Sequence, residues 1–161
     1  MQKSTHILLA TLLISPACLA ADGHDNGHGL KHHALGVFVG RSNERGGGDE
    51  VSIGLEYEYR FNQHWGAGGL VEYTPDGHSD DGITVALASG YYHPYKGWRL
   101  GLGFGRERVH GDHGYYQWLY RAGVAYDFHV GRFGIAPSVN YDIIEGNSNV
   151  LIYGVALVYP F

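Results

Sequence analysis

The clearest pattern in the chain is a strict alternation of apolar and polar positions over residues 50–61, EVSIGLEYEYRF. The odd-numbered positions carry large apolar or aromatic side chains, whereas the even-numbered positions carry serine, glycine, glutamate and arginine. Successive side chains of a β-strand point to opposite faces, so this period of two predicts a strand with one apolar and one polar face. The segment is long enough for a tilted strand to cross a membrane.

The same alternation recurs along the chain. It is strong over 116–128 and 132–143, and weaker over 33–41, 64–74, 82–93 and 97–108. The last segment, 149–161, has an apolar face that ends on Phe161, and such a chain end is held in place only if it pairs with another strand. Together these segments predict eight strands and an all-β fold.

The connections between these segments alternate in length. Those after the first, third, fifth and seventh strands are long and polar, and the others are short. This arrangement predicts an eight-stranded antiparallel up-and-down transmembrane β-barrel with both termini at the turn end. Aromatic residues gather where the two membrane interfaces should lie: near the turns Phe61, Trp65, Tyr91, Trp98, Tyr126, Phe128 and Phe133, and near the loops Tyr73, Tyr116, Trp118 and Tyr141.

A soluble, lipocalin-like barrel in the periplasm is the competing interpretation, because alternation alone does not say which face points inward. In a soluble barrel the apolar face would lie inside. The polar face here has few, balanced charges and many glycines, which suits a crowded lumen better than a solvated surface. We therefore expect the apolar face to lie outside, in lipid.

The N-terminal segment is typical of secretion. Lys3, the apolar run 7–14, Pro16 and the small residues Cys18 and Ala20 predict a signal peptide over 1–20 that is cleaved after Ala20. A lipoprotein site at Cys18 is the alternative. A His/Gly-rich segment, 21–32, would then precede a barrel over 33–161, and the mature chain would contain no cysteine. We expect the protein in the bacterial outer membrane with both termini periplasmic.

With these features the mature chain resembles the small eight-stranded outer-membrane β-barrel family, which includes OmpX-like and opacity-type proteins and the barrel half of OmpA. The resemblance implies that Tyr159 and Phe161 form the signal read by the barrel-assembly machinery, although Ala156 and Pro160 depart from the usual pattern. It implies outer-membrane lipids and lipopolysaccharide as partners and a monomeric state. No peptidoglycan-binding domain is expected after the barrel.

Charged residues on the polar face predict an ion-pair network inside the lumen, because buried charges need partners. We expect Glu56 and Arg121 to meet across the lumen, directly or through Glu58, and Arg99 to pair with Asp127. The predicted network consists of Glu56, Glu58, Arg60, Glu72, Arg99, Arg121, Asp127 and Asp142. The net charge of -5 and the scattered basic residues give no indication of nucleic-acid binding.

Small residues are also predicted to line one wall of the lumen, namely Gly66, Gly68, Ala86, Ala88, Gly90, Gly101, Gly103 and Gly105. Long side chains from the opposite wall would fill this space, or an acyl chain would, as in lipid A palmitoyltransferase barrels. The serine and histidine motif of lipid A deacylase barrels is not found. We therefore expect no enzymatic activity and no cofactor.

Histidines form a further candidate site, for a metal ion. His24, His28, His32 and His33 precede the first strand, and His110 and His113 flank Asp112 in the third loop. Imidazole and carboxylate suit zinc, copper or nickel, but no spacing here defines a metal site.

The predicted function is that of a non-enzymatic outer-membrane barrel that acts through its loops and barrel in envelope integrity or adhesion. The alternatives are a narrow gated pore, a lipid A-modifying or lipid-binding barrel, and a soluble periplasmic binding protein.

Overall fold

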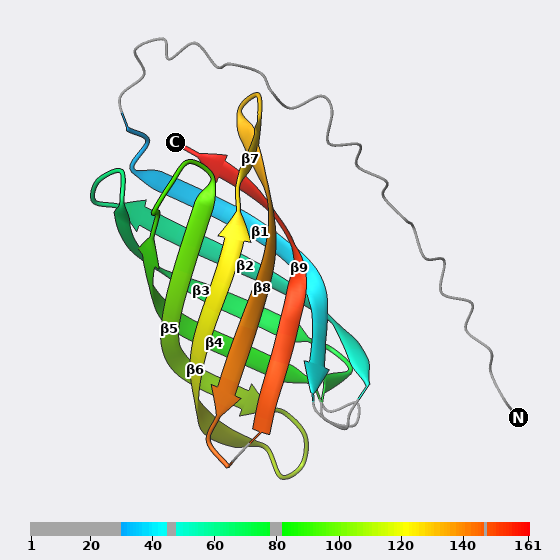
Figure 1. The fold of residues 1–161 in the computed structure, drawn as a ribbon. Helices are drawn as coiled ribbons and strands as arrows, with labels where there is room; N and C mark the ends of the chain where they lie inside the picture. The colour runs from blue at the N-terminus through cyan, green and yellow to red at the C-terminus, as the bar shows by residue number, and fades with distance from the viewer. Residues whose placement is uncertain (1–29, 45–47, 78–81, 147) are drawn as a thin grey trace, which may run out of the picture.

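The structure is a computed structural model that describes residues 30–44, 48–77, 82–146 and 148–161. These residues form a closed antiparallel β-barrel (Figure 1). Its strand segments are β1 (His33–Glu44), β2 (Asp49–Arg60), β3 (Trp65–Thr74), β4 (Ile83–Tyr92), β5 (Trp98–Val109), β6 (Tyr115–Tyr126), β7 (Phe128–Val130), β8 (Phe133–Ile144) and β9 (Ser148–Pro160).

The segments β6 and β7 occupy one position in the barrel wall, so the wall has the eight strands that the sequence predicts. Both pair with β8, and the two pairings continue a single register. In that register Tyr126 stands opposite Pro137, and proline has no backbone N–H to donate. The ladder is therefore interrupted at Asp127, between the two segments.

The barrel closes between its first and last strands, as predicted. β1 pairs with β9 from Ala34↔Pro160 to Glu44↔Val150. Beyond the ladder, the His33 N–H donates to the Phe161 carbonyl at 3.1 Å, and the Phe161 N–H donates to the His33 carbonyl at 2.8 Å. This closure explains how the chain ends on an apolar strand without fraying.

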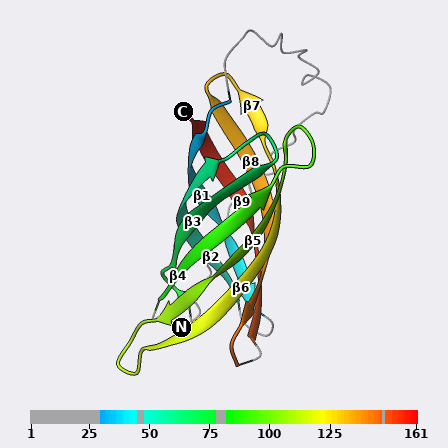
Figure 2. The same ribbon diagram turned by 90° about the vertical axis from the view of Figure 1, so that its left-hand side faces the viewer.

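The strands wind obliquely around the barrel (Figure 2). Following paired residues around the wall, Ala34 leads through Glu58, Arg121 and Val150 back to β1 at Glu44, ten residues further along the same strand. An eight-stranded wall with this stagger has strands tilted by about 40° from the barrel axis. Residues that are linked through successive ladder pairs therefore do not lie at the same height along the barrel axis.

The contrast between loops and turns is smaller than predicted. The loop-end connections are 45–48, 75–82, 110–114 and 145–147, and the turn-end connections are 61–64, 93–97 and 131–132. Several strands continue past the predicted boundaries, because ladder pairs such as Asn43↔Asp49 and Ile144↔Ser148 extend them toward the loops. The loop end lies at the bottom of Figure 1, and the turn end, with the C-terminus, at the top.

The apolar face points outward, as expected for a barrel in lipid. Leu55, Val155 and Leu102 on three different strands are 57%, 46% and 71% exposed. The charged face points into the lumen, where Glu58 and Asp142 are each 2% exposed. The soluble interpretation, in which the apolar face lies inside, is therefore wrong.

One strand has the opposite orientation to the prediction. In β4, Ala86, Ala88 and Gly90 lie on the outer face, while Val85, Leu87, Ser89 and Tyr91 face the lumen. This strand carries no charged residue, so the alternation did not identify its polar face. Larger inward side chains on β4 complement the inward glycines of β5, which leave room for them.

The predicted signal peptide and most of the His/Gly-rich segment lie outside the described residues. Within the described ranges, no helix is long and apolar enough to cross a membrane.

Candidate functional site

The candidate site is the lumen of the barrel, because its inward-facing side chains include most of the charged residues of the wall. The eight charged residues predicted for the lumen all project inward, from β2, β3, β5, β6, the Asp127 junction and β8. They form two separate clusters rather than one network.

The first group, which we call the loop-side cluster, consists of Glu72, Arg121 and Asp142. Arg121 Nε and Nη2 donate to the two carboxylate oxygens of Asp142 at 2.6 and 2.7 Å, and Nη1 donates to Glu72 Oε2 at 2.9 Å. Asp142 is the cross-strand neighbour of Arg121, whereas Glu72 reaches it from β3 across the lumen. The side chains are only 7%, 3% and 2% exposed, for Arg121, Glu72 and Asp142 in turn, so this cluster ties opposite walls together away from solvent.

The second group, which we call the turn-side cluster, lies nearer the periplasmic turns predicted from the sequence. Arg99 donates to Glu56 at 2.8 Å and lies 3.8 Å from Glu58. Arg60 bridges Glu58 and Asp127 at 3.5 and 3.7 Å. The turn-side cluster comprises Glu56, Glu58, Arg60, His93, Arg99 and Asp127.

His93 belongs to this cluster but was missed by the sequence analysis. It lies in the turn between β4 and β5, and its Nε2 is 2.6 Å from Glu58 Oε1. Its ring is 11% exposed and covers Glu58 on the side that faces the turn end of the lumen. It ends the predicted segment 82–93 and shares the odd-numbered face with the inward residues of β4, and its partner lies 35 residues away in the sequence.

Both specific pairings predicted from the sequence are wrong. Arg121 binds Glu72 and Asp142 instead of Glu56, because the strand tilt brings Glu72 level with Arg121 and leaves Glu56 nearer the turns. Arg99 binds Glu56 instead of Asp127. The register places Arg99 opposite Ala125, so Asp127 is only a diagonal neighbour, and its carboxylate lies by Arg60.

A cavity of about 60 Å³ separates the two clusters. Its polar lining includes Ser89, Tyr91, Ser138 and Asn140, and glycines 101 and 103 leave the space open. A volume of this size holds only a few water molecules. The lumen as described therefore has no room for the acyl chain considered from the sequence.

On the loop side of the cavity an apolar layer closes the lumen. Leu119 is completely buried, and it packs with Val85, Leu87 and Ile144. Ser52 and Thr74, also in the loop-side half of the lumen, share a buried hydrogen bond at 2.6 Å. The described residues thus leave no open channel through the barrel.

The histidines predicted as weak metal ligands do not meet in the described part of the chain. His32 Nδ1 lies 2.7 Å from the Arg60 carbonyl, His33 Nδ1 lies 2.8 Å from the Tyr57 hydroxyl, and His110 bonds Thr84 at 2.9 Å. Asp112 and His113 are exposed in the loop between β5 and β6. Among the described residues no group of three or more metal-ligating side chains is present, and His24 and His28 lie outside them.

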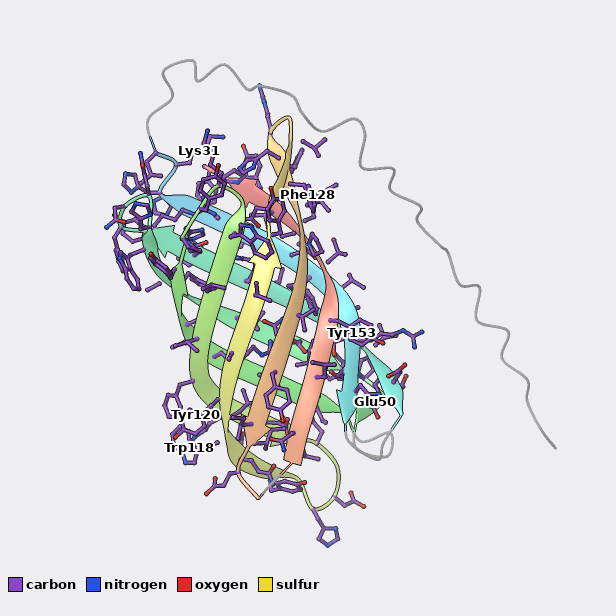
Figure 3. All side chains as sticks on the ribbon, viewed as in Figure 1. Lys31, Glu50, Trp118, Tyr120, Phe128 and Tyr153 are labelled. Carbon is purple, nitrogen blue, oxygen red and sulfur yellow. The ribbon has the colours of Figure 1, made fainter. Side chains whose placement is uncertain are left out.

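The outer wall has aromatic residues at both ends. At the turn end, rings pair across strands, as Trp65 does with Tyr92 and Trp98 with Tyr126. At the loop end, Trp118 stacks on Phe104 with centroids 4.9 Å apart, and the labelled Trp118 and Tyr120 project away from the barrel (Figure 3). Tyr91, expected at the turn-side interface, instead faces the lumen and lies under Arg99. Two aromatic zones flanking an apolar band are typical of membrane barrels.

Comparison with known proteins gives similarity at the level of structure only. No protein-family model matches the chain, and no curated protein sequence matches it. Ail, the attachment invasion locus protein of Yersinia pestis, has 19% sequence identity and a TM-score of 0.55, over 80% of this chain and 96% of Ail. Neisserial surface protein A has 16% identity and a TM-score of 0.50 over 80% of this chain and 96% of that chain.

A de novo designed transmembrane β-barrel is similar as well, with 12% identity and a TM-score of 0.50 over 78% of this chain and 94% of the design. A designed barrel shares the architecture without shared ancestry, so these similarities concern the fold. The chain has the fold of the small transmembrane β-barrels built from eight antiparallel strands.

Proposed function

We propose that this protein is an integral outer-membrane β-barrel of a Gram-negative envelope, without enzymatic activity, that acts through its loop end in envelope integrity or adhesion. One observation carries the proposal: an apolar outer wall with aromatic residues at both ends surrounds a charged lumen that is closed by ion pairs and an apolar layer. Such a wall is stable in lipid, and such a lumen is suited to structure rather than to transport.

The likeness to Ail and to Neisserial surface protein A supports a role at the cell surface, since those proteins are described as an attachment invasion locus protein and a surface protein. In the proposed orientation both termini face the periplasm and the loops face outward. Lipopolysaccharide and the other outer-membrane lipids are the proposed partners, and the barrel is proposed to be a monomer.

Assembly is proposed to depend on the C-terminal strand. The Tyr159 and Phe161 rings lie 6.0 Å apart on the outer face, where the assembly machinery would recognise them before β9 closes on β1. The mature protein is proposed to begin at Ala21. The histidine segments remain weak candidates for metal binding and have no proposed role in the function.

Electrophoresis tests the fold in the membrane. Folded protein should migrate faster than boiled protein in detergent gels, because a closed barrel keeps its backbone hydrogen bonds internal and resists denaturation. In membranes, Leu55→Arg should lower the free energy of unfolding by about 2 to 4 kcal/mol, since it places a charge near mid-membrane on the lipid face. Equal mobility before and after boiling would contradict the proposal.

A narrow pore is the second candidate, and the polar cavity between the two clusters is the observation in its favour. Planar-bilayer recordings distinguish the two functions. The favoured function predicts no steady conductance, and regular unitary currents from purified wild-type protein would support the pore instead.

A further inference from the structure

The outer wall carries a pair of arginines that the lumen and the fold do not explain. Arg106 and Arg108 are alternate residues of β5, so both project from the lipid-facing side, and both are exposed. They lie toward the loop end, at the level of Trp118 and Tyr116 on the neighbouring strand. A charged side chain on this wall is costly unless it lies near a membrane interface and finds a partner there.

Aromatic rings hold both guanidinium groups in place. The Arg106 guanidinium lies 4.2 Å from the centroid of the Trp118 ring, and that of Arg108 lies 5.5 Å from the Tyr116 ring. Each ring belongs to the residue directly across the ladder from its arginine. A ring face attracts the positive charge but offers no oxygen to accept hydrogen bonds, so the guanidinium N–H groups still need acceptors.

Arg41, a third arginine on the outer wall, provides a comparison within the molecule. Its guanidinium lies 3.7 Å from the Asp49 carboxylate on the next strand, and Asn43 binds the same carboxylate at 2.6 Å. This arginine therefore has a protein acceptor, whereas Arg106 and Arg108 rest on rings.

An apolar groove of about 440 Å³ lies beside this pair on the outer wall. The small residues Gly69 and Ala86 form the floor of the groove, and Leu55, Tyr57 and Val71 border it. Ala86 is the cross-strand neighbour of Arg106, so the groove begins next to the arginine pair. A cationic head beside an apolar groove matches a lipid that carries a phosphate next to its acyl chains.

The geometry points to a binding site for one lipopolysaccharide molecule. A lipid A phosphate binds Arg106 and Arg108, and an acyl chain lies in the groove, whose end at Ala86 is next to Arg106. This inference rests on the proposed outer-membrane location and its outward loop end, and it identifies a site for a proposed partner. Arginine suits this role because its planar N–H groups form paired hydrogen bonds with phosphate oxygens while the other face stacks on a ring.

Retention of lipopolysaccharide by the purified barrel tests the site. Wild-type protein, extracted from outer membranes in mild detergent, should keep lipid A in near-stoichiometric amount, measured by mass spectrometry. Arg106→Gln/Arg108→Gln should bind rough lipopolysaccharide about tenfold more weakly in phosphatidylcholine nanodiscs, because it loses charge-assisted hydrogen bonds to phosphate. The control Lys96→Gln/Arg132→Gln makes the same charge change in the turns and should bind as wild type does.

The groove is tested separately, without a change in charge. Ala86→Trp should fill the end of the groove beside Arg106 and weaken lipopolysaccharide binding. Ala122→Trp, at an outward alanine of β6, should not weaken it. Dephosphorylated lipopolysaccharide should bind wild type and the arginine variant equally weakly. Equal affinity of wild type for lipopolysaccharide and for phosphatidylglycerol would overturn the site as one for lipopolysaccharide.

Heat-dependent gel mobility of every variant shows whether it has folded. If the double glutamine variant does not fold, the single variants Arg106→Gln and Arg108→Gln replace it, and each should show a smaller loss of binding. If the variants are folded in membranes but bind as wild type does, the lipid site is wrong and the proposed outer-membrane barrel stands. If the wild-type protein shows no heat-dependent mobility, the proposed function itself fails.

Discussion

The two ion-pair clusters of the lumen share the same chemistry but differ in how completely their groups are satisfied. In the loop-side cluster, Arg121 makes three hydrogen bonds of 2.6 to 2.9 Å with two carboxylates. In the turn-side cluster, three of the contacts are 3.5 to 3.8 Å long. Three buried atoms there, Glu58 Oε2, Arg60 Nε and Asp127 Oδ1, have no hydrogen bond within the described residues.

The difference indicates that the two ends of the lumen have different roles. The loop-side cluster lies under the apolar layer of Leu119 and Ile144, and its side chains are at most 7% exposed, so bulk water does not reach it from the loop end. The turn-side cluster includes more exposed side chains, such as Arg60 and Glu56 at 20% and 17%, and we infer that water entering beside them completes the hydrogen bonds of its buried unpaired atoms. We infer that the loop side is a fixed tie between the walls and that the turn side is the more adjustable end.

The strongest test of this comparison removes one arginine from each cluster. Arg121→Ala should lower the free energy of unfolding by about 3 to 5 kcal/mol, because it leaves two carboxylates buried without a counter-charge. Arg60→Ala should cost only about 1 kcal/mol, because water reaches the site and Arg99 remains close to Glu58. Urea titration of protein folded in lipid vesicles measures both. Equal losses would mean that the clusters do not differ in solvation.

The apolar layer above the loop-side cluster is tested by Leu119→Ala. This side chain is fully buried, so its truncation should cost about 3 kcal/mol through lost contacts and the cavity left behind. Leu119→Met, which keeps the volume, should cost less than about 1.5 kcal/mol. The same titration applies, and a negligible loss for the alanine variant would contradict tight packing of Leu119 in this layer.

The sequence predicted the wall of the barrel better than its interior. Strands such as 50–61 and 132–143 carry charges on one face, so both their existence and their orientation follow from alternation. The segment 82–93 has no charge, and its orientation follows instead from the size of its neighbours: Leu87 and Tyr91 fill space beside the glycines of β5. That complementarity exists only once the strands are paired.

Which charged residues meet in the lumen depends on the stagger of the strands, and this stagger cannot be read from any one strand. Residue types alone placed Arg121 and Glu72 on inward faces, but their meeting depends on the stagger accumulated around the whole wall. The same stagger separates Glu56 from Arg121 and brings it to Arg99. His93 ends the alternating segment 82–93, whose inward face was predicted to be the even-numbered one, so its inward contact with Glu58 was missed.

Double-mutant cycles separate the predicted pairing from the observed one. Glu72 and Arg121 share a buried hydrogen bond, so the effects of Glu72→Ala and Arg121→Ala should be non-additive by about 1 to 3 kcal/mol. Glu56→Ala and Arg121→Ala should be additive within about 0.5 kcal/mol, because the two residues share no partner. Strong coupling of Glu56 with Arg121 would mean that the observed register between opposite walls is incorrect.

The smallest expected effect concerns His93, which joins the turn between β4 and β5 to the turn-side cluster. His93→Ala should lower the free energy of unfolding by about 1 kcal/mol, the usual net value of one hydrogen bond, because Arg60, Arg99 and entering water still surround Glu58. His93→Gln keeps an N–H donor and should recover part of this loss, and His129→Ala, at an exposed position of β7, should have no effect. Hydrogen exchange adds a spatial test: the amides of Trp98 and Arg99, next to the turn, should exchange faster in His93→Ala, while those of Leu119 and Arg121 should not change. If the amides at both ends accelerate together, the lumen opens as one unit and the turn side has no separate mobility.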